Sequence, residues 1–462
     1  MSDINPSSCS IEKAFIETYD GESNADIKKM ITGFELEQGM NMSSYKGVID
    51  VMDNIGVLEK TPLRGEESLE LWITAHDGSG SIKLNNRIFK IDSIQPSDVG
   101  KGLIYKIHFI SEDSFNAGKK IITQSNYKPV YEIVKQIFNS SFCRIPGEGS
   151  DFYTDQEEEK LPFRSKRWAL EKLNGLHKRD IIIQQTDKPH NIIIPRLSSQ
   201  EAMYFLASRS YSAETPSQSF KFFETFERYY FCTDEYFVKF HNNNPKNIFK
   251  LHYSPISELQ SGSIDPVQQM SKIDNLFVDN KGIDSASDMA SGAYKNKVIE
   301  IDFVRKKVTS NIFNYDNASY IDMSGDIKNI DNNPHSATFR EDTFTDNNAP
   351  QFLIFKNYST NGDNISNLPG DRMLTNILQN RISYYHHLNN TAIIAQLKGR
   401  IDLRPGMIID LSIPSFDGDG TKRNAQLAGR YMIQSIKHQM KKDNTLSTGI
   451  RMIKFDWSGN NE

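Results

Sequence analysis

The stretch LAGRYMIQSIKHQM, residues 427–440, decides our interpretation of the fold, because it predicts a long strand in the last part of the sequence. Successive side chains of a strand point to opposite faces. Alternation places Tyr431 and Ile433 on one face, and Met432, Ile436 and Met440 on the other. Both faces are partly apolar, which indicates burial on both sides, as in a barrel strand that also meets a neighbour. The tyrosine and His438 have no evident catalytic partner, so we interpret the stretch as scaffold.

The sequence on either side of this stretch predicts further strands. Alternating β-branched and apolar residues occur in TAIIAQLKG (391–399), LRPGMIIDLSIP (403–414) and LSTGIRMIKFDW (446–457). KKDN (441–444) has the length of a four-residue hairpin connection. Pro405-Gly406 favours a type II turn, in which glycine adopts a positive φ. The last part of the chain is therefore predicted to be all β.

The first quarter of the chain has the same period of two. The candidate strands are GVIDVMDNIG (47–56), LELWITA (69–75), FKIDSI (89–94) and LIYKIHFISE (103–112). Such runs are typical of half-buried strands. No internal sequence repeat is evident. Both ends of the chain are nevertheless β-rich and of comparable size, which is compatible with two related barrels.

Between these regions the pattern is a mixture of helix and strand. SNYKPVYEIVKQIF (125–138) has apolar residues at helical spacing. NIIIP (191–195) is a candidate buried strand, and Ser198 with Glu201 has the spacing of a capping box that begins a helix. FKFFETFERYYF (220–231) predicts an aromatic hairpin. These segments together indicate a small α/β insertion.

The segments that follow the insertion are more varied. Residues 285–302 predict a short helix that passes into a strand, and residues 372–388 predict a helix with one apolar side. Residues 314–370 are rich in Asn and Asp with weak periodicity, which indicates an irregular insertion on the surface. The acidic run at 156–160 is predicted to be a solvated loop.

Composition argues against several classes of protein. The 462 residues include 54 Lys and Arg against 59 Asp and Glu, and this net charge of −5 does not suit a surface that grips nucleic acid through clustered basic residues. No apolar run reaches the ~18 residues of a membrane span, and MSDINPSSCSIEK at the start does not have the pattern of a secretory signal. Three widely separated cysteines, Cys9, Cys143 and Cys232, fit a reducing compartment.

Motifs of known chemistry are not found in the sequence. None of the ten histidines lies in a zinc-ligand spacing, and the adjacent His386 and His387 point about 100° apart on a helix. FDGDGTKRN (416–424) resembles the start of an EF-hand calcium loop. The fifth and twelfth positions of that loop, which need Asx and Glu, are Thr421 and Ala428. No phosphate loop or G-x-S-x-G motif is present. We therefore assign no catalytic, metal-binding or cofactor-binding residue, and we expect no enzymatic activity.

Five groups of patterned segments follow one another in an order that is informative. They are VIDVMDNIG with PLRGEESLELWI; LIYKIHFISEDSFNAGK with SNYKPVYEIVKQIF; NIIIPRLSSQEAMYFLASRSY with FKFFETFERYYF; DMASGAYKNKVIEIDFVRKKV; and LRPGMIIDLSIP with LAGRYMIQSIKHQM and LSTGIRMIKFDW. In this order they resemble the baseplate hub proteins of contractile phage tails, of the T-even type, which are related to the hub part of type VI secretion spikes. The resemblance covers most of the chain.

The resemblance implies a mainly β fold with α+β insertions: two tail-tube-like antiparallel β-barrel domains, a small α/β insertion domain and a helical and irregular insertion. The implied divisions are 1–115 for the first barrel, 116–246 for the helix and α/β insertion, 247–302 with 389–457 for the second barrel, and 303–388 for the Asn/Asp-rich insertion and helix. Residues 314–370 have no counterpart in the family. No spike domain follows Trp457, so we expect the spike to be a separate protein.

The resemblance also implies a structural function in the tail baseplate of a virion, after assembly in the host cytoplasm. The implied partners are two further copies in a homotrimer, the hexameric ring of tube protein, the trimeric central spike and other baseplate proteins. DNA would pass through the channel only in transit, and no membrane insertion is expected. The candidate contact residues are Glu66 and Glu67 in the first barrel, and Tyr431, His438, Arg451 and Trp457 in the second.

Two alternative functions stay open at this point. A tail-associated hydrolase of the cell wall would need an acid and a base in a cleft, and no pair of carboxylates is singled out among 59 acidic residues. A carbohydrate-binding tail protein would use an aromatic platform. Its candidate residues are Tyr204, Phe222, Phe223 and Tyr229. The last three belong to the aromatic run 220–231, and such a run on a hairpin is more often part of a core.

Overall fold

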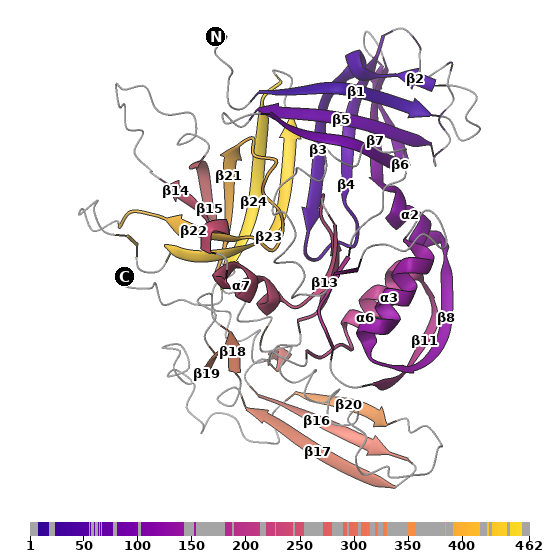
Figure 1. Ribbon diagram of the computed structural model, residues 1–462, viewed down its shortest axis with the longest axis vertical. Coiled ribbons are helices and arrows are strands. Elements are labelled where there is room, and N and C mark those ends of the chain that lie inside the picture. The colour runs from indigo at the N-terminus through magenta and orange to yellow at the C-terminus, as the bar shows by residue number, and fades with distance from the viewer. Residues whose placement is uncertain are drawn as a thin grey trace.

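The architecture of the chain is that of a computed structural model (Figure 1). The residues that the structure describes are 8–17, 24–54, 56, 60, 63, 65, 67–76, 81–99, 103–142, 152–153, 181–186, 189–212, 219–226, 228–243, 245–253, 271–279, 290–292, 295–303, 306–314, 319–321, 327–329, 350–356, 384, 391–415, 423–424, 427–440 and 444–454.

The first unit of the fold is a curved sheet in the order β2-β1-β5-β6-β7-β4-β3, with antiparallel pairing between all neighbours. Its strands are β1 (Cys9–Glu17), β2 (Asn24–Asp26), β3 (Ile31–Gly39), β4 (Lys46–Asp53), β5 (Ser68–His76), β6 (Ser81–Val99) and β7 (Leu103–Ser111). The 3-10 helix η1 (Lys28–Met30) leads into β3. The predicted period of two is confirmed in β4, where Gly47, Ile49, Val51 and Asp53 are buried and the residues between them are not.

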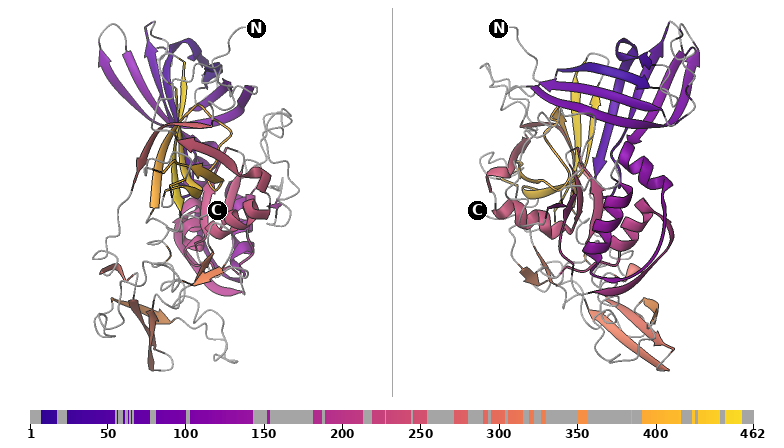
Figure 2. Two further views of the ribbon diagram at one scale, coloured as in Figure 1. Left: turned by 90° about the vertical axis from the view of Figure 1, so that its left-hand side faces the viewer. Right: turned by 45° about the vertical axis from the view of Figure 1, so that its right-hand side comes forward.

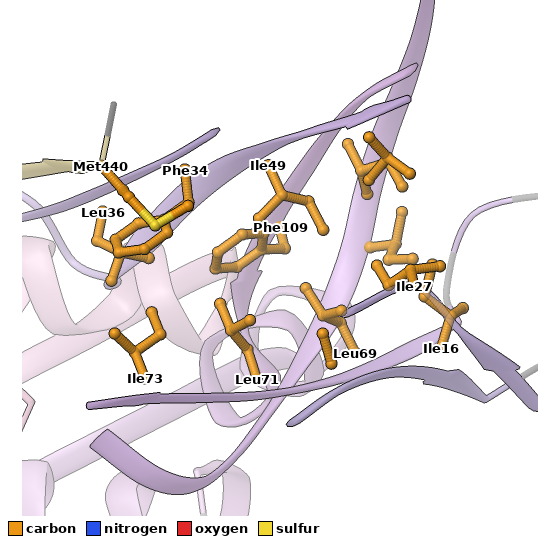
Figure 3. Close-up of a cluster of buried hydrophobic side chains, with 14 of the residues drawn as sticks. Ile16, Ile27, Phe34, Leu36, Ile49, Leu69, Leu71, Ile73, Phe109 and Met440 are labelled. Atoms are coloured by element: carbon orange, nitrogen blue, oxygen red, sulfur yellow. The ribbon is translucent and has the colours of Figure 1, made fainter. Parts of the chain in front are cut away.

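The first sheet curves around a core of apolar side chains, which is the reason for its shape. Figure 3 shows side chains of different strands that point toward one another in this core, among them Phe34, Leu36, Ile49, Leu69, Leu71, Ile73 and Phe109. Met440 joins the same core from the far end of the chain. The first and last parts of the sequence are therefore packed together.

The second unit is a barrel that closes on itself in the order β23-β22-β14-β15-β21-β24, with β24 paired back to β23. Its strands are β14 (Phe249–Tyr253), β15 (Lys272–Val278), β21 (Thr391–Lys398), β22 (Ile408–Ser412), β23 (Gly429–Met440) and β24 (Leu446–Lys454). Its core has apolar side chains from all six of these strands. β14 pairs parallel with both β22 and β15, whereas the other pairings are antiparallel. The fold class predicted from the sequence is confirmed: the protein is mainly β with a barrel and α/β insertions.

Five strands of each unit follow one plan. The order β3-β4-β7-β6-β5 of the first sheet matches the order β15-β21-β24-β23-β22 of the second, and the strands occur in the same sequence along the chain in both units. Every one of these pairings is antiparallel. The two units differ in the strand beside β5 and β22, because β1 runs antiparallel to β5 and β14 runs parallel to β22.

Even the irregularities of the two units coincide. β6 has a register shift against β7 between Ile91 and Ser93, and β23 has one against β24 between Ile433 and Ser435. The equivalent segments read IDSI (91–94) and IQSI (433–436). This corrects the expectation that the sequence holds no internal repeat. The repeat is confined to a few residues around a bulge, and strand pairing is needed to align it.

The bulge in β23 also corrects one predicted face. Ile436 packs in the barrel core with Tyr431 and Ile433, and not on the face of Met432, which joins a cluster on the outside of the barrel. A bulge inserts one residue into a strand and reverses the alternation beyond it. The prediction that β23 is buried on both faces is confirmed by these two clusters.

The α/β insertion leaves the first sheet after β7 and lies beside both units (Figure 1). It contains α2 (Glu112–Lys119), the pair β8 (Ile121–Lys128) and β11 (His190–Ser198), α3 (Val130–Ser141), α6 (Ser199–Ala207), and the sheet β12-β13-β10-β9. The strands of that sheet are β9 (Phe152–Tyr153), β10 (Ile181–Ile183), β12 (Lys221–Glu224) and β13 (Tyr229–Cys232), and α7 (Asp234–Asn243) and η2 (Pro245–Asn247) lead on to β14.

Several local predictions for the insertion are confirmed. The capping box of Ser198 and Glu201 begins α6, and the aromatic hairpin forms β12 and β13. The apolar residues of 125–138 that predicted a helix lie on α3, which begins at Val130, and residues up to Lys128 belong to β8. Pro129 explains the boundary, since the residue before a proline avoids helical backbone angles.

A small separate sheet projects from the rest of the molecule, at the end opposite β1 in all views (Figures 1 and 2). It has the order β17-β16-β20, from β16 (Lys295–Asp302), β17 (Lys307–Asn314) and β20 (Gln351–Lys356). The predicted second barrel included residues 247–302. This is corrected for β16, residues 295–302, which lies in the separate sheet. The alternation of buried residues in β16 identifies a strand but not the sheet to which it belongs.

The remaining predictions fall mainly on residues that are not described. They include the helix over 372–388, of which only Tyr384 is described, and the acidic loop at 156–160. In the Asn/Asp-rich segment 314–370, the described parts are Asn314, the hairpin of β18 (Ser319–Ile321) with β19 (Ile327–Asn329), Pro350 and β20.

Candidate assembly interface

Strand β23 is the place where the two units meet. One edge of β23 pairs with β22 through residues 429–432 and then with β3 through residues 435–440, while the other edge pairs with β24. Backbone bonds from Ile433 N to Met407 O (2.9 Å) and from Met40 N to Gln434 O (2.9 Å) mark the change of partner. The two sheets are therefore continuous through one shared strand, which we call the internal junction (β3 with residues 435–440 of β23).

The tip of the β12–β13 hairpin covers the internal junction. Phe226 stacks on the imidazole of His438, with ring centroids 5.6 Å apart, and meets Tyr45 edge-on at 4.4 Å. The side chain of Gln38 on β3 accepts a hydrogen bond from Phe226 N (3.3 Å) and donates one to Leu403 O (3.4 Å). The hairpin, the first sheet and the second barrel are therefore locked into one arrangement.

Glu224 ties the insertion to the first sheet. Its side chain is fully buried at the end of β12. One carboxylate oxygen, Oε2, accepts hydrogen bonds from Ser111 Oγ (2.6 Å), Tyr45 N (3.1 Å) and Ser114 Oγ (3.4 Å). A buried carboxylate is costly unless it is hydrogen-bonded. These three donors come from β7, the loop before β4 and α2, so the carboxylate holds these elements at one point.

A buried ion pair holds α7 against the same hairpin. Lys221 Nζ contacts both carboxylate oxygens of Asp234, at 2.7 and 2.8 Å, and both side chains are almost inaccessible. The hydroxyl of Tyr384 lies 3.5 Å from the same carboxylate. Breaking a buried pair is strongly destabilising because it leaves an unpaired charge. Glu224, Lys221 and Asp234 were not singled out by the sequence, because acidic and basic residues in strands and helices are usually solvated.

His438 lies inside the internal junction and is fully buried. Its Nδ1 is 3.0 Å from Thr448 Oγ1 on β24. Burial lowers the pKa of the imidazole to about 4, with a smaller opposing effect of the Asp402 carboxylate. The ring is therefore neutral at neutral pH. A side chain enclosed in this way is contacted by this chain's own residues, so we assign it a structural role within the fold.

Tyr431 has a comparable position within the second barrel. Its ring is buried in the barrel core, and its hydroxyl donates a hydrogen bond to Leu427 O at 2.8 Å. Lys454 Nζ lies 5.7 Å from the ring centroid. Burial raises the pKa of the phenol. The sequence placed Tyr431 and His438 among contact residues, but the structure brings both inside the chain.

The other candidate contact residues are distributed differently. Arg451 is half-buried on β24, and its Nε is 3.3 Å from Asp279 Oδ2, directly after β15. Glu67 is buried at the start of β5, and its carboxylate accepts a hydrogen bond from Gly65 N at 2.9 Å. Glu66 and Trp457 lie outside the described residues. Among the four candidates that the structure describes, Arg451 is the one whose side chain contacts the end of β15, through Asp279.

The aromatic residues considered for carbohydrate binding do not form a platform. Phe222, Phe223 and Tyr229 are fully buried in two clusters at the insertion, and Tyr204 is exposed on α6. Phe222 and Tyr229 stack on each other across the hairpin, with centroids 5.7 Å apart. The prediction that the aromatic run is core is confirmed for these three residues.

Two kinds of feature are absent from the described residues, a metal-binding cluster and a membrane-spanning helix. No group of three or more His, Cys, Asp or Glu side chains among them is arranged to hold a metal ion. No helix in the described part of the chain is long and apolar enough to span a membrane. The described cysteines, Cys9 and Cys232, are buried and unbridged.

Comparison with known proteins gives a fold. No family model and no curated protein sequence matches the chain. The 43 kDa tail protein of prophage MuSo2 from Shewanella oneidensis is similar in structure, with a TM-score of 0.50 at 8% identity, over 96% of this chain and 99% of that one. A tail protein from Neisseria meningitidis MC58 gives 0.48 at 10% identity, over 96% and 97%. The E. coli c3393 protein, a component of the type VI secretion system, gives 0.38 at 10% identity, over 97% and 77%. At 8% identity the first likeness shows that the chain has the fold of a phage tail protein.

Proposed function

We propose that this protein is a structural hub of a contractile phage tail, in which three copies join the six-membered tail tube to a three-membered spike. The observation that carries the proposal is the pair of five-stranded units with the same strand order, β3-β4-β7-β6-β5 and β15-β21-β24-β23-β22. The fold shared with a tail protein supports the setting. The internal junction supports the geometry, because it fixes two equivalent units side by side in one chain.

Symmetry explains the use of two equivalent units. A ring of six subunits and a spike of three cannot be joined by identical contacts of single-unit chains. A chain with two similar units offers six positions from three copies, and closed rings are the usual outcome of head-to-tail contacts that complete a rotation. The insertion and the separate three-stranded sheet then break the sixfold repeat and leave three identical features for a trimeric partner.

The partners of the proposed hub are the tube protein ring, a separate central spike protein and other baseplate proteins. DNA would pass through the ring during ejection without being bound, and the net charge of −5 suits such a channel, because a basic wall would hold phosphates. Assembly in the host cytoplasm would precede its place in the virion tail. No enzymatic activity is part of this proposal.

The proposal is tested by the mass of the protein in solution, alone and after mixing with the spike protein encoded nearby. Light scattering coupled to size exclusion should give three chains of 52.8 kDa in at least one of the two samples. A monomer in both samples would contradict the hub. Activity against purified peptidoglycan, lost on substitution of an acidic residue, would instead support the hydrolase.

A further inference from the structure

The first sheet has an edge equivalent to the edge of β23 that pairs with β3 at the internal junction. No described strand pairs with this equivalent edge. At the internal junction, β3 lies on the edge of β23 that continues beyond β22. In the first sheet, β6 is equivalent to β23 and β5 is equivalent to β22. β5 pairs with β6 only as far as Lys90, and Ile91 N then bonds to Glu67 O at 2.9 Å, as Ile433 N bonds to Met407 O.

Beyond this point one edge of β6 has no strand partner in the described part of the chain. Residues 93–99 pair with β7 on one side, and no described strand pairs with their other side. The equivalent residues of β23, 435–440, are the ones that bind β3. The first sheet therefore carries, on β6, the same kind of acceptor edge that the second barrel fills with β3.

The strand that pairs with this edge at the internal junction, β3, also has an equivalent in the second barrel, which is β15. β15 is equivalent to β3, and both have a register shift near their start: between Ile31 and Gly33 in β3, and between Ile273 and Asn275 in β15. β14 pairs with β15 only at Lys272 and Ile273. The rest of that edge of β15 has no strand partner among the described residues.

Side-chain exposure differs between β3, which pairs with β23, and β15, where the rest of the equivalent edge has no described strand partner. Leu36 of β3 is 1% exposed, whereas Val278, at the equivalent position of β15, is 40% exposed. Phe277, equivalent to Glu35, is 62% exposed, and its cross-strand neighbour Ile394 is 41% exposed. Exposed apolar side chains along an open strand edge are a site for pairing with another chain.

We propose that β15 of one copy pairs antiparallel with residues 93–99 of β6 in the next copy, in the register of the internal junction. The pair of Gln439 with Glu35 then corresponds to Ser97 opposite Phe277, and the pair of His438 with Leu36 corresponds to Pro96 opposite Val278. Pro96 has no N–H, so this ladder has at most one bond fewer at that point. Three internal junctions and three of these contacts close a ring of six units.

The occupant of the β15 edge is a second copy of this chain, because the complementary edge lies on the chain itself. The relation between the units is head-to-tail: the first strand of one unit, β3 or β15, binds the long strand of the next, β23 or β6. A heterologous contact of this kind repeats until a ring closes. This inference rests on the proposed trimer and adds its register and its contact residues.

A register-specific disulfide tests the pairing. Residues opposite each other in an antiparallel pair have Cα atoms about 4.5–5.5 Å apart, which a disulfide spans. The variant with both Ser97→Cys and Phe277→Cys should give a covalent trimer under mild oxidation, seen by non-reducing electrophoresis and reversed by reductant. The two single-cysteine variants report the background from the native cysteines.

A shifted pair is the matched control. In the variant with Ser93→Cys and Phe277→Cys, the two positions are displaced by four residues, about 13 Å along the strand. This is beyond the reach of a disulfide, so little cross-linking is expected. Equal cross-linking of both double variants would overturn the register. A trimer by light scattering with no cross-link in the Ser97 variant would overturn the pairing while leaving the hub intact. A monomer throughout would overturn the hub, and the pairing with it.

A variant without cysteines gives a second measurement. Phe277→Glu places a charge on the proposed contact and should weaken the trimer. The protein concentration needed to form the trimer should rise by at least about tenfold. Leu353→Glu is the matched control, because Leu353 is 60% exposed on β20 of the separate sheet. Loss of the trimer with Leu353→Glu, and not with Phe277→Glu, would place the contact elsewhere and overturn the proposal.

Discussion

The two units of this protein share a strand order but differ in how their edges are completed. In the second barrel, β14 fills the gap between β22 and β15 and pairs parallel with both. In the first sheet, β1 occupies the equivalent place beside β5 in the opposite direction and does not pair with β3. β3 is thereby available to β23, and the two units are joined.

The cores of the two units show how one backbone plan tolerates different side chains. Gly47 on β4 lies opposite Phe109 on β7, and the equivalent pair in the second barrel is Ile393 opposite Met452. A very small residue beside a large one is thus exchanged for two residues of middle size. Cores accept such substitutions when total volume and pattern are kept. The comparison teaches that pairing and volume, more than residue identity, are what the two units have in common.

Truncation of these equivalent core residues should have the largest effects. Phe109 and Met452 are both fully buried. Phe109→Ala should cost about 3–5 kcal/mol of unfolding free energy, and Met452→Ala about 2–5 kcal/mol, because each leaves a cavity. Urea unfolding measures both, with Phe303→Ala, at an exposed position, as the control expected within about 0.5 kcal/mol. An effect confined to one unit would break the comparison.

Acid should destabilise the internal junction. The pKa of His438 is about 4 in the folded protein, below its value of 6.5 without burial, so the unfolded chain binds more protons between these values. The contribution of the neutral histidine is therefore full above about pH 6.5 and is lost as the pH falls toward 4, by roughly 2–4 kcal/mol. Buried His241, whose pKa is also lowered to about 4, adds a loss in the same window.

The position equivalent to His438 in β6 is Pro96, which does not titrate, so this pH dependence belongs to one junction and not to its counterpart. Unfolding midpoints at pH 7.5, 6 and 5 measure it. His438→Gln should lower stability at pH 7.5 and flatten the pH dependence, while His241 retains its share. An unchanged slope in this variant would show that His438 does not carry the effect.

A methyl group at Gly47 should have a smaller effect than a core truncation. A Cβ there would lie 2.5 Å from Cζ of Phe109 and 2.6 Å from Glu35 O. Gly47→Ala should therefore cost about 1–3 kcal/mol through overpacking, and Phe109→Leu in the same chain should reduce the added cost. Gly449→Ala is the control in the second barrel, where the nearest atom to the new Cβ is Lys437 O at 3.8 Å. Equal costs at both glycines would contradict the packing argument.

The ion pair of Arg451 with Asp279 should have the smallest effect. The pair is 3.3 Å long and both side chains are partly exposed. Solvent screening limits such a pair to about 0.2–1 kcal/mol. A double-mutant cycle with Arg451→Ala and Asp279→Ala isolates this coupling in the unfolding free energy. A coupling well above 1 kcal/mol would show that the end of β15 is more enclosed in solution than in the single chain.

The sequence predicted elements better than partners. The capping box located α6, and alternation located β4, β5, β7 and β23. Alternation is informative because a strand with one buried face has apolar residues at every second position. Alternation does not state which strand lies alongside, so the parallel pairing of β14 and the separate sheet of β16 were not predicted. The buried Glu224 was likewise beyond reach, since its environment is built by residues distant in sequence. His438 was named as a scaffold and contact residue, but the sequence did not show that the hairpin tip and β3 would enclose it.

The central claim is that two equivalent units in each chain make six positions from three copies. End-on averages of purified particles by electron microscopy test it most directly. The account predicts a closed ring with threefold symmetry in which six similar lobes surround one opening, with three further densities from the insertions. Rings with another number of lobes, or particles of a single chain under all conditions, would contradict it.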